Sequence, residues 1–568
     1  MKKLIAMLLA LAMVFSLVAC GPKDDPAVEN PDPTPGTEDP VTTDKNAEGD
    51  VNIDASDVED AKTDYVHPIV HMVEKNDFLT IDPFERSAPT ATYELYEYLY
   101  VYPSYDGEAE PVLCDRNKGN YGGYTHEDGT GVYTFHLYDY IVDHKGNNIT
   151  ADDVVFSYNH FLENNKINGT GYRKMQSYEA TGEYDVTFTF SEELTGLREL
   201  ETVITACPII SEKSYNELGG NLVTDECGTG PYVLKSFTSG SETVLVKYDN
   251  YWQTNDELKS IRQLANVQEI NYAYLPDASQ QIIAMQDGKI DLIQDASADF
   301  VDMFREGGQY DEGFNVISYL QSGCLRVSLN HSKPDHQTFK RTMRLAIYYA
   351  IDNEGFVQAM GGDKYGKVTP TVWGVGQPDF QEAWYDLENF NTVYDLELSK
   401  QYAADAGYNG EPLVLLAETS LKTEAELLAE MLKQAGFNID LQVVDESTNR
   451  TRSDNGEWDI QLGNAAGYCG AMMVMNNFSY KHENADGVEV GSAFEEDFEW
   501  LDLADTLASI EGHTAENATA WVEGNVEGAH HMGLCTTWIN LVVNDSITAV
   551  CRTDKNKLIP GSFTYVEG

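Results

Sequence analysis

Two periodicities of apolar and polar positions alternate along this chain. Val132–Tyr138 and Glu183–Phe190 alternate apolar with polar side chains, which is typical of strands that bury one face. Between them, Thr150–Asp153 resembles a capping box, with Asp in the place of the usual Glu or Gln. This signal predicts an amphipathic helix that begins there and runs to about Glu163. The strand-helix-strand order recurs on both sides of residue 320.

The rest of the chain continues both patterns, so we expect an α/β fold. Further strands are expected at Tyr65–Val73, Val267–Tyr274, Lys289–Ile293, Leu325–Asn330, Leu413–Leu416 and Phe437–Val444. Further helices are expected at Thr90–Tyr100, Ala278–Gln286, Gln337–Met360 and Thr423–Ala435. A chain of 568 residues is too long for one hydrophobic core, and the two blocks of alternating strands and helices indicate two α/β lobes.

A glycine-rich stretch, Gly228–Trp252, carries the strongest local signal. Gly228, Gly230 and Pro231 predict a rigid turn, because Gly tolerates positive φ and Pro fixes φ. Two β-rich runs follow, separated by Thr-Ser-Gly-Ser, and this arrangement predicts a hairpin.

The N-terminus carries a basic and apolar leader. Two lysines precede an apolar region, Leu4–Ala19, which is too short for a membrane span and has the flanks of a signal peptide. The region ends in Leu-Val-Ala-Cys, which resembles the lipobox of bacterial lipoproteins and implies cleavage before Cys20 and a lipid on its sulfur. We therefore expect a signal peptide at 1–19 and a lipid-anchored protein on the extracytoplasmic face of the cell membrane, at the cell surface or in a periplasm.

Residues 20–64 are predicted to form a disordered acidic linker. After Cys20 this segment holds six Pro and fourteen Asp or Glu but no aromatic residue, so it cannot bury enough apolar surface to fold. The whole chain is acidic, with 94 Asp and Glu against 37 Lys and Arg and a formal net charge of −57. This balance argues against nucleic acid as a partner, since phosphate binding needs clustered Lys and Arg.

Six stretches of the chain together carry a resemblance to a known family. They are Tyr133–Leu137, Thr150–Tyr158, Cys227–Lys235, Tyr248–Trp252, Leu275–Ser279 with Gln286–Asp291, and Arg344–Asp352. In order and spacing they resemble the family 5 extracellular solute-binding proteins, over about residues 65–550. This family comprises the oligopeptide, dipeptide and nickel binders of ABC importers.

The resemblance implies a type II periplasmic-binding-protein-like fold, with two large lobes joined by a hinge plus an inserted third domain. Lobe I is expected to be discontinuous, at 65–90, 203–320 and 533–568, with lobe II at 91–202 and lobe III at 321–532. A solute bound between lobes I/II and lobe III would stabilise the closed form, which docks on the permease. The implied protein is a monomer without cofactor that works with the permease and ATPase subunits of an ABC importer.

One stretch of the resemblance bears on the solute. In oligopeptide binders an aspartate two residues after a cysteine pairs with the α-ammonium group of the peptide, and here that position is Ala471. A hydrogen bond to such a charged group is worth roughly 1.5–3 kcal/mol. A peptide remains the leading expectation, and an oligosaccharide stacked on Tyr and Trp rings is the alternative.

The resemblance also implies which residues contact the solute and which cysteines pair. The expected solute contacts are Ser87, Pro89, Trp373, Thr419, Asn464, Tyr468, Ala471 and Met472. A disulfide is implied between Cys324 and Cys469, and more weakly between Cys207 and Cys227, with fully reduced cysteines as the alternative. Arg344 lies on an otherwise apolar helix and is expected to make a structural ion pair.

Other classes of function find less support. The cysteines have no zinc-type spacing, and the adjacent His530 and His531 would point to opposite sides of a strand, so we expect no metal site. The chain has no HExxH or GxSxG motif, so a secreted hydrolase is not expected. A surface receptor or sensor of the same fold stays open, because it would differ only in its partner.

Overall fold

The computed structural model describes residues 61–566, except for 75–78, 86–89, 103–108, 119–124, 128–130, 165–171, 173–174, 191–196, 295, 297, 322, 332–333, 370, 376–379, 388–393, 466–481, 484–488, 491–502, 509–511, 513, 530 and 552–557. All described residues belong to one compact unit, Lys45–Gly568.

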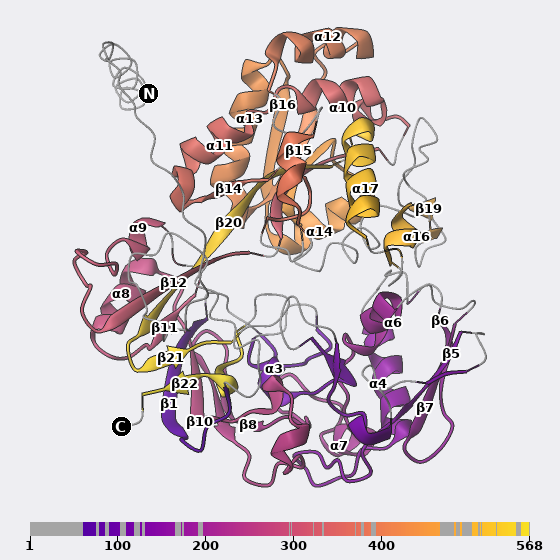
Figure 1. Cartoon of the computed structure of the whole chain (residues 1–568), viewed down its shortest axis with the longest axis vertical. Coiled ribbons are helices and arrows are strands. Elements are labelled where there is room, and N and C mark those ends of the chain that lie inside the picture. Colours follow the sequence, from indigo (N-terminus) through magenta and orange to yellow (C-terminus); the bar gives the residue numbers. More distant parts are fainter. Residues whose placement is uncertain are drawn as a thin grey trace, which may run out of the picture. The chain divides into compact units, whose positions relative to one another are not determined.

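A mixed sheet of twelve strands forms the framework of this unit (Figure 1). Ten strands form a continuous path, and β12 and β14 each pair with β20 beside it. In order along the path, the strands are β16 (Ile439–Val444), β15 (Leu413–Glu418), β17 (Ile460–Ala465), β13 (Cys324–Leu329), β20 (His531–Asn544), β11 (Leu292–Ile293), β1 (His67–Glu74), β10 (Val267–Tyr274), β9 (Glu242–Lys247) and β8 (Tyr232–Thr238), with β12 at Phe314–Leu320 and β14 at Gly366–Val368.

One strand, β20, joins the two halves of this sheet. Its first half pairs with β13 and β14, and its second half pairs with β12 and β11. Most of its 14 residues are buried, and its apolar run Leu541–Val543 is fully buried. A strand covered on both faces needs such a run, because neither face meets water.

Two large hydrophobic cores lie along the sheet. One includes Val70 of β1, Ile270 of β10 and Leu541 of β20, and the other includes Val327 of β13 and Leu415 of β15. Two cores agree with a chain too long to be organised around one. The boundaries expected for the three lobes stay a prediction.

A second sheet of four strands has the order β4-β5-β7-β6. Helix α4 (Ala151–Asn164) packs on β6 and β7, and its start confirms the predicted cap. The backbone N–H and the hydroxyl of Thr150 donate to Oδ2 of Asp153 at 2.8 and 2.9 Å. The strands are β4 (Thr125–Glu127), β5 (Val132–His136), β6 (Met175–Ala180) and β7 (Asp185–Phe190).

Helices cover the sheets. The remaining α-helices are α3 (Thr92–Leu95), α6 (Leu197–Ile204), α7 (Glu212–Glu217), α8 (Ala278–Gln286), α9 (Ala298–Val301), α10 (Arg341–Tyr348), α11 (Asn353–Met360), α12 (Leu396–Ala406), α13 (Lys422–Gln434), α14 (Glu446–Asn455), α16 (Leu503–Ala508) and α17 (Ala515–Gly528). Three two-stranded sheets complete the described elements: β2 (Tyr100–Val101) with β3 (Glu110–Pro111), β18 (His482–Glu483) with β19 (Glu489–Val490), and β21 (Ile547–Ala549) with β22 (Thr564–Tyr565).

Two expected helices were wrong in extent. The helix expected at Thr90–Tyr100 is the single turn α3, after which the chain becomes extended. The helix expected at Gln337–Met360 is divided between α10 and α11. The division falls before Asp352, whose carboxylate accepts a hydrogen bond from the N–H of Gly355 at 2.8 Å and caps α11.

The glycine-rich stretch forms the predicted hairpin, β8 and β9, and its turn packs against α3. The N–H of Gly230 donates to the carbonyl of Leu95 at 3.0 Å. A Cβ atom on Gly228 would overlap that carbonyl, and one on Gly230 would overlap the carbonyl of Glu94. Glycine is therefore required here for close backbone approach.

A buried histidine, His144, also forms a hydrogen bond with this turn. His144 Nδ1 lies 2.6 Å from Glu226 Oε2, and His144 Nε2 lies 2.8 Å from the carbonyl oxygen of Gly230. Burial favours the neutral ring, but the charge of Glu226 and these hydrogen bonds outweigh it, so the pKa of His144 is raised.

Replacing Gly228 by Ala should destabilise the fold, because the new methyl group would overlap the backbone of Leu95. Overpacking of this kind typically costs about 1–3 kcal/mol, measured here as the free energy of unfolding in urea. Gly463→Ala is the matched control, since a Cβ atom there would meet no atom within 4 Å. Equal losses in the two variants would contradict the close-approach explanation.

Candidate functional site

The carboxyl ends of three parallel strands meet at one edge of the twelve-stranded sheet. β15 is parallel to β16 and to β17, with Leu416 paired to Gln461. Thr419 and Asn464 each lie three residues further along, so the register brings both to the same edge. In open α/β sheets, ligands bind outside the carboxyl ends of the strands.

Polar groups line this edge. Thr419 is exposed, and its hydroxyl donates to the carbonyl of Val444, at the end of β16, at 3.1 Å. Glu418 accepts from Asn449 Nδ2 at 3.2 Å and from the hydroxyl of Ser420 at 3.3 Å. Asn464 is exposed on β17. Two of the expected solute contacts therefore lie together, on a surface that offers both donors and acceptors.

Trp373 does not lie on such a surface, which corrects the expectation that it contacts solute. Its side chain is fully buried in a cluster of three tryptophans, with ring centroids 5.5 Å from Trp384 and 5.4 Å from Trp521. An indole buries a large apolar area, so a tryptophan ring packed between two other tryptophan rings belongs to the hydrophobic core.

The other expected solute contacts lie outside the described residues and stay predictions. They are Ser87, Pro89, Tyr468, Ala471 and Met472. The lipidation residue Cys20 lies outside the described residues as well.

The weaker disulfide prediction does not hold, because Cys207 and Cys227 are both free buried thiols. The thiol of Cys207 lies 3.5 Å from the carbonyl of Pro208. Burial, followed by the charge of Glu226, raises the pKa of Cys227. Cys324 is also a free buried thiol, 3.2 Å from the carbonyl of Val372. Its expected partner Cys469 lies outside the described residues, so that pairing stays a prediction for the oxidised protein.

A structural ion pair was expected for Arg344, and the contacts described for it are hydrogen bonds to backbone carbonyls. Its guanidinium donates to the carbonyl of Gly528 through Nε at 3.1 Å and Nη2 at 3.0 Å. Nη1 donates to the carbonyls of Thr338 and Phe339 at 3.1 and 2.5 Å. The group therefore holds the end of α17 against the start of α10.

Sequence reasoning missed several buried charged residues, among them Glu97. Glu97 follows α3 and accepts from Tyr251 Oη at 2.5 Å, Trp252 Nε1 at 2.8 Å and Gln263 Nε2 at 2.9 Å. Burial raises its pKa against the opposing effect of these bonds. A further charged residue that was missed is the half-buried Arg326 on β13, whose Nε and Nη1 atoms are shielded from solvent. Both interrupt apolar stretches, which is the only signal of them in the sequence.

Among the residues that the structure describes, no group of three or more His, Cys, Asp and Glu side chains is placed to hold a metal ion. His531 is buried beside Ser328, with its Nδ1 3.0 Å from the serine hydroxyl. Burial, followed by the charge of Arg326, lowers the pKa of His531 well below its usual value. A search of the same described residues also finds no helix long and apolar enough to cross a membrane.

Residues 111–486 match the model of the family described as "Bacterial extracellular solute-binding proteins, family 5 Middle". The chain belongs to this family. Family 5 consists of solute-binding proteins, and the edge that carries Thr419 and Asn464 falls within the matched range.

Curated relatives of this solute-binding protein carry names of peptide binders. It is 23% identical over 435 residues to the probable D,D-dipeptide-binding periplasmic protein DdpA of Escherichia coli K12, covering 72% of this chain and 78% of DdpA. It is 24% identical over 364 residues to the oligopeptide-binding protein AppA of Bacillus subtilis 168, covering 59% of this chain and 62% of AppA.

Solved structures confirm the expected type II periplasmic-binding-protein-like fold. AppA of Bacillus subtilis with a nonapeptide has a TM-score of 0.68 at 16% identity, over 89% of this chain and 100% of AppA. DppA of Helicobacter pylori with the peptide STSA has a TM-score of 0.69 at 17% identity, over 90% and 99%. AgaA of A. tumefaciens R10 with agropinic acid has a TM-score of 0.70 at 18% identity, over 88% and 99%.

Replacing Trp373 by Ala should lower the free energy of unfolding by about 3–5 kcal/mol, the usual cost of emptying a buried aromatic site. Asn464→Ala, at an exposed position, should change it by no more than about 0.5 kcal/mol. Urea unfolding of both variants makes the comparison. A small loss for Trp373→Ala would show that its ring is not the core of the tryptophan cluster.

Proposed function

We propose that this solute-binding protein captures a peptide outside the cytoplasm and delivers it to the permease of an ABC importer. The observation that carries the proposal is the family match over residues 111–486, together with relatives named for dipeptide and oligopeptide binding. The peptide leaves unchanged, because the proposed work is differential binding to two conformations of the protein rather than chemistry.

The exposed edge of β15 and β17 supplies suitable groups for this task. An extended peptide presents alternating N–H and C=O groups. The amide of Asn464 can donate and accept, and the hydroxyl of Thr419, whose hydrogen is donated to Val444, can accept. Such neutral groups bind a peptide backbone without selecting its side chains. The edge can therefore bind the backbone of the solute, while the charged groups of the solute need partners elsewhere.

Solute identity is tested by a thermal-shift screen of the mature domain with short peptides, oligosaccharides and Ni²⁺. A peptide at 100 times its Kd should add about 2.7 kcal/mol to the free energy of unfolding, seen as a higher unfolding temperature. Stabilisation by sugars and not by peptides would overturn the peptide proposal in favour of the oligosaccharide alternative, which Ala471 keeps open. Stabilisation by Ni²⁺ alone would indicate a metal solute.

The proposed protein is held at the membrane by a lipid on Cys20. The support is the sequence: an apolar leader ends in Leu-Val-Ala-Cys, and an acidic, proline-rich linker follows. Replacing Cys20 by Ser removes the thiol that accepts the lipid. The variant should move from the membrane fraction to the soluble extracytoplasmic fraction, measured by immunoblot of separated fractions, with the same change at Cys551 as the control. A Cys20→Ser protein that stays on the membrane would contradict the anchor.

A further inference from the structure

Arg326 occupies a central position in the twelve-stranded sheet. It lies on β13, between β17 and β20, and pairs with Gly463 on one side and Gly533 on the other. Residues paired directly across strands project from the same face of a sheet. The arginine side chain therefore rises from a row in which both of its neighbours lack side chains.

No described residue pairs with this cation. The Nε and Nη1 atoms of Arg326 are shielded from solvent and have no hydrogen-bond partner, and no carboxylate among the described residues forms an ion pair with it. Arg344, on α10, differs from it, because its guanidinium donates four hydrogen bonds to backbone carbonyls. The two arginines thus differ in kind: Arg344 is part of the scaffold, and Arg326 is left with unused donors.

The surroundings of Arg326 on this face are neutral or positive. His531, two residues before Gly533, is held neutral by burial and by the neighbouring arginine charge, which lowers its pKa. Burial lowers the pKa of Arg326 itself, and the Cys324 sulfur is what opposes this. In a chain with 94 acidic residues, a shielded arginine without a carboxylate is a costly arrangement.

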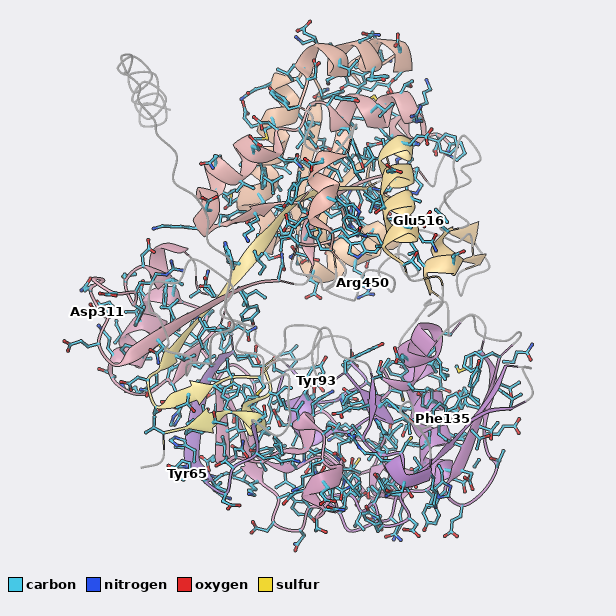
Figure 2. All side chains as sticks on the ribbon, viewed as in Figure 1. Tyr65, Tyr93, Phe135, Asp311, Arg450 and Glu516 are labelled. Atoms are coloured by element: carbon cyan, nitrogen blue, oxygen red, sulfur yellow. The ribbon has the colours of Figure 1, made fainter. Side chains whose placement is uncertain are left out.

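The two glycines paired with Arg326 differ in what covers them. Over Gly533 the carbonyl of Thr371 lies where a Cβ atom would be, so the loop before Trp373 closes that side. Over Gly463 no atom of the described residues lies within 4 Å of the Cβ position. α14, on which Figure 2 labels Arg450, contacts the same face through Ser453 Oγ and Gln461 Oε1, 3.3 Å apart. Among the described residues, the Cβ position of Gly463 is thus the uncovered place in the row of Arg326.

We propose that Arg326 binds a carboxylate of the solute, through the space over Gly463. The proposal rests on the proposed function and deepens it by naming the chemistry of the solute. A planar guanidinium pairs with a carboxylate through two parallel hydrogen bonds, which gives both affinity and orientation. The chain lacks the acidic anchor for a peptide ammonium at Ala471. In this proposal the protein selects instead a solute that carries a C-terminal carboxylate or an acidic side chain.

An unpaired, shielded arginine should lower the stability of the solute-free protein, and this effect can be tested without knowing the solute. Arg326→Met keeps the length of the side chain and removes the charge, so the unfolding temperature of the solute-free protein should rise by on the order of 2 °C. Arg305→Met is the matched control, because Arg305 is also half-buried and donates to Ser318 Oγ at 3.3 Å. It should not stabilise the protein. A lower unfolding temperature for Arg326→Met would overturn the proposal, since it would make Arg326 a structural residue.

Capture of solutes tests the chemistry itself. The mature protein and its Arg326→Met, Arg326→Lys and Arg305→Met variants are incubated with a protein hydrolysate and, separately, with a mixture of small carboxylic acids. Bound molecules are identified by mass spectrometry. The original chain and Arg305→Met should enrich solutes with a free carboxylate, whereas Arg326→Met should bind them roughly 30-fold more weakly or not at all. Arg326→Lys should retain part of the binding. Peptides amidated at the C-terminus, and peptides with Gln in place of Glu, identify which carboxylate is used.

The outcomes separate this inference from the proposed function. Peptides captured equally well by the original chain and by Arg326→Met would overturn the role of Arg326 and leave peptide binding standing. Capture of non-peptide acids alone, lost in Arg326→Met, would support the role of Arg326 and overturn the peptide proposal. Capture of neither set by the original chain would overturn both.

Discussion

The fold depends on the pairing of one strand, β20. Its 14 residues pair with β13 and β14 at one end and with β12 and β11 at the other, so one stretch of backbone belongs to both halves of the sheet. Side chains secure both ends. Asn353 Nδ2 donates to the carbonyl of Gly533 at 3.0 Å, and Asn540 Nδ2 donates to the carbonyl of Ala296 at 3.2 Å. A strand fixed in this way transmits the register of one half of the sheet to the other.

The same constraint creates the position of the unpaired arginine. Because β20 is held in register, Gly533 lies beside Arg326, and the backbone of Thr371 fills the place of its missing side chain. On the opposite side, no atom of the described residues covers the Cβ position of Gly463 on β17. The glycine-rich turn around Gly228 serves the other half of the molecule differently, because its glycines allow backbone to touch backbone and leave no space at all. Glycine thus has two roles here: at Gly228 it allows close packing of backbone segments, and at Gly463 it leaves space beside Arg326.

Local signals in the sequence predicted local structure well. The cap at Thr150–Asp153 and the hairpin after Gly228 form as expected, because the groups that stabilise them are close in sequence. The helix expected at Thr90–Tyr100 failed for the opposite reason. Glu97 is committed to Tyr251, Trp252 and Gln263, more than 150 residues away, and these contacts override local helix preference.

The candidate site was predictable in the same uneven way. Thr419 follows the end of β15, where a strand was expected, whereas Asn464 lies on β17, where none was expected. Both positions came from the family resemblance, and both are exposed. The burial of Trp373 depends on Trp384 and Trp521, and the isolation of Arg326 depends on two glycines far along the chain. Alternation along β13 shows that Arg326 projects away from its apolar neighbours, but no single stretch shows that it lacks a partner.

The most direct measurement is a crystal structure of the protein with the solute that it captures. Carboxylate recognition predicts a solute oxygen about 2.7–2.9 Å from Nε or Nη1 of Arg326, in the space over Gly463. A bound solute with no carboxylate oxygen within hydrogen-bond distance of those nitrogens would contradict it.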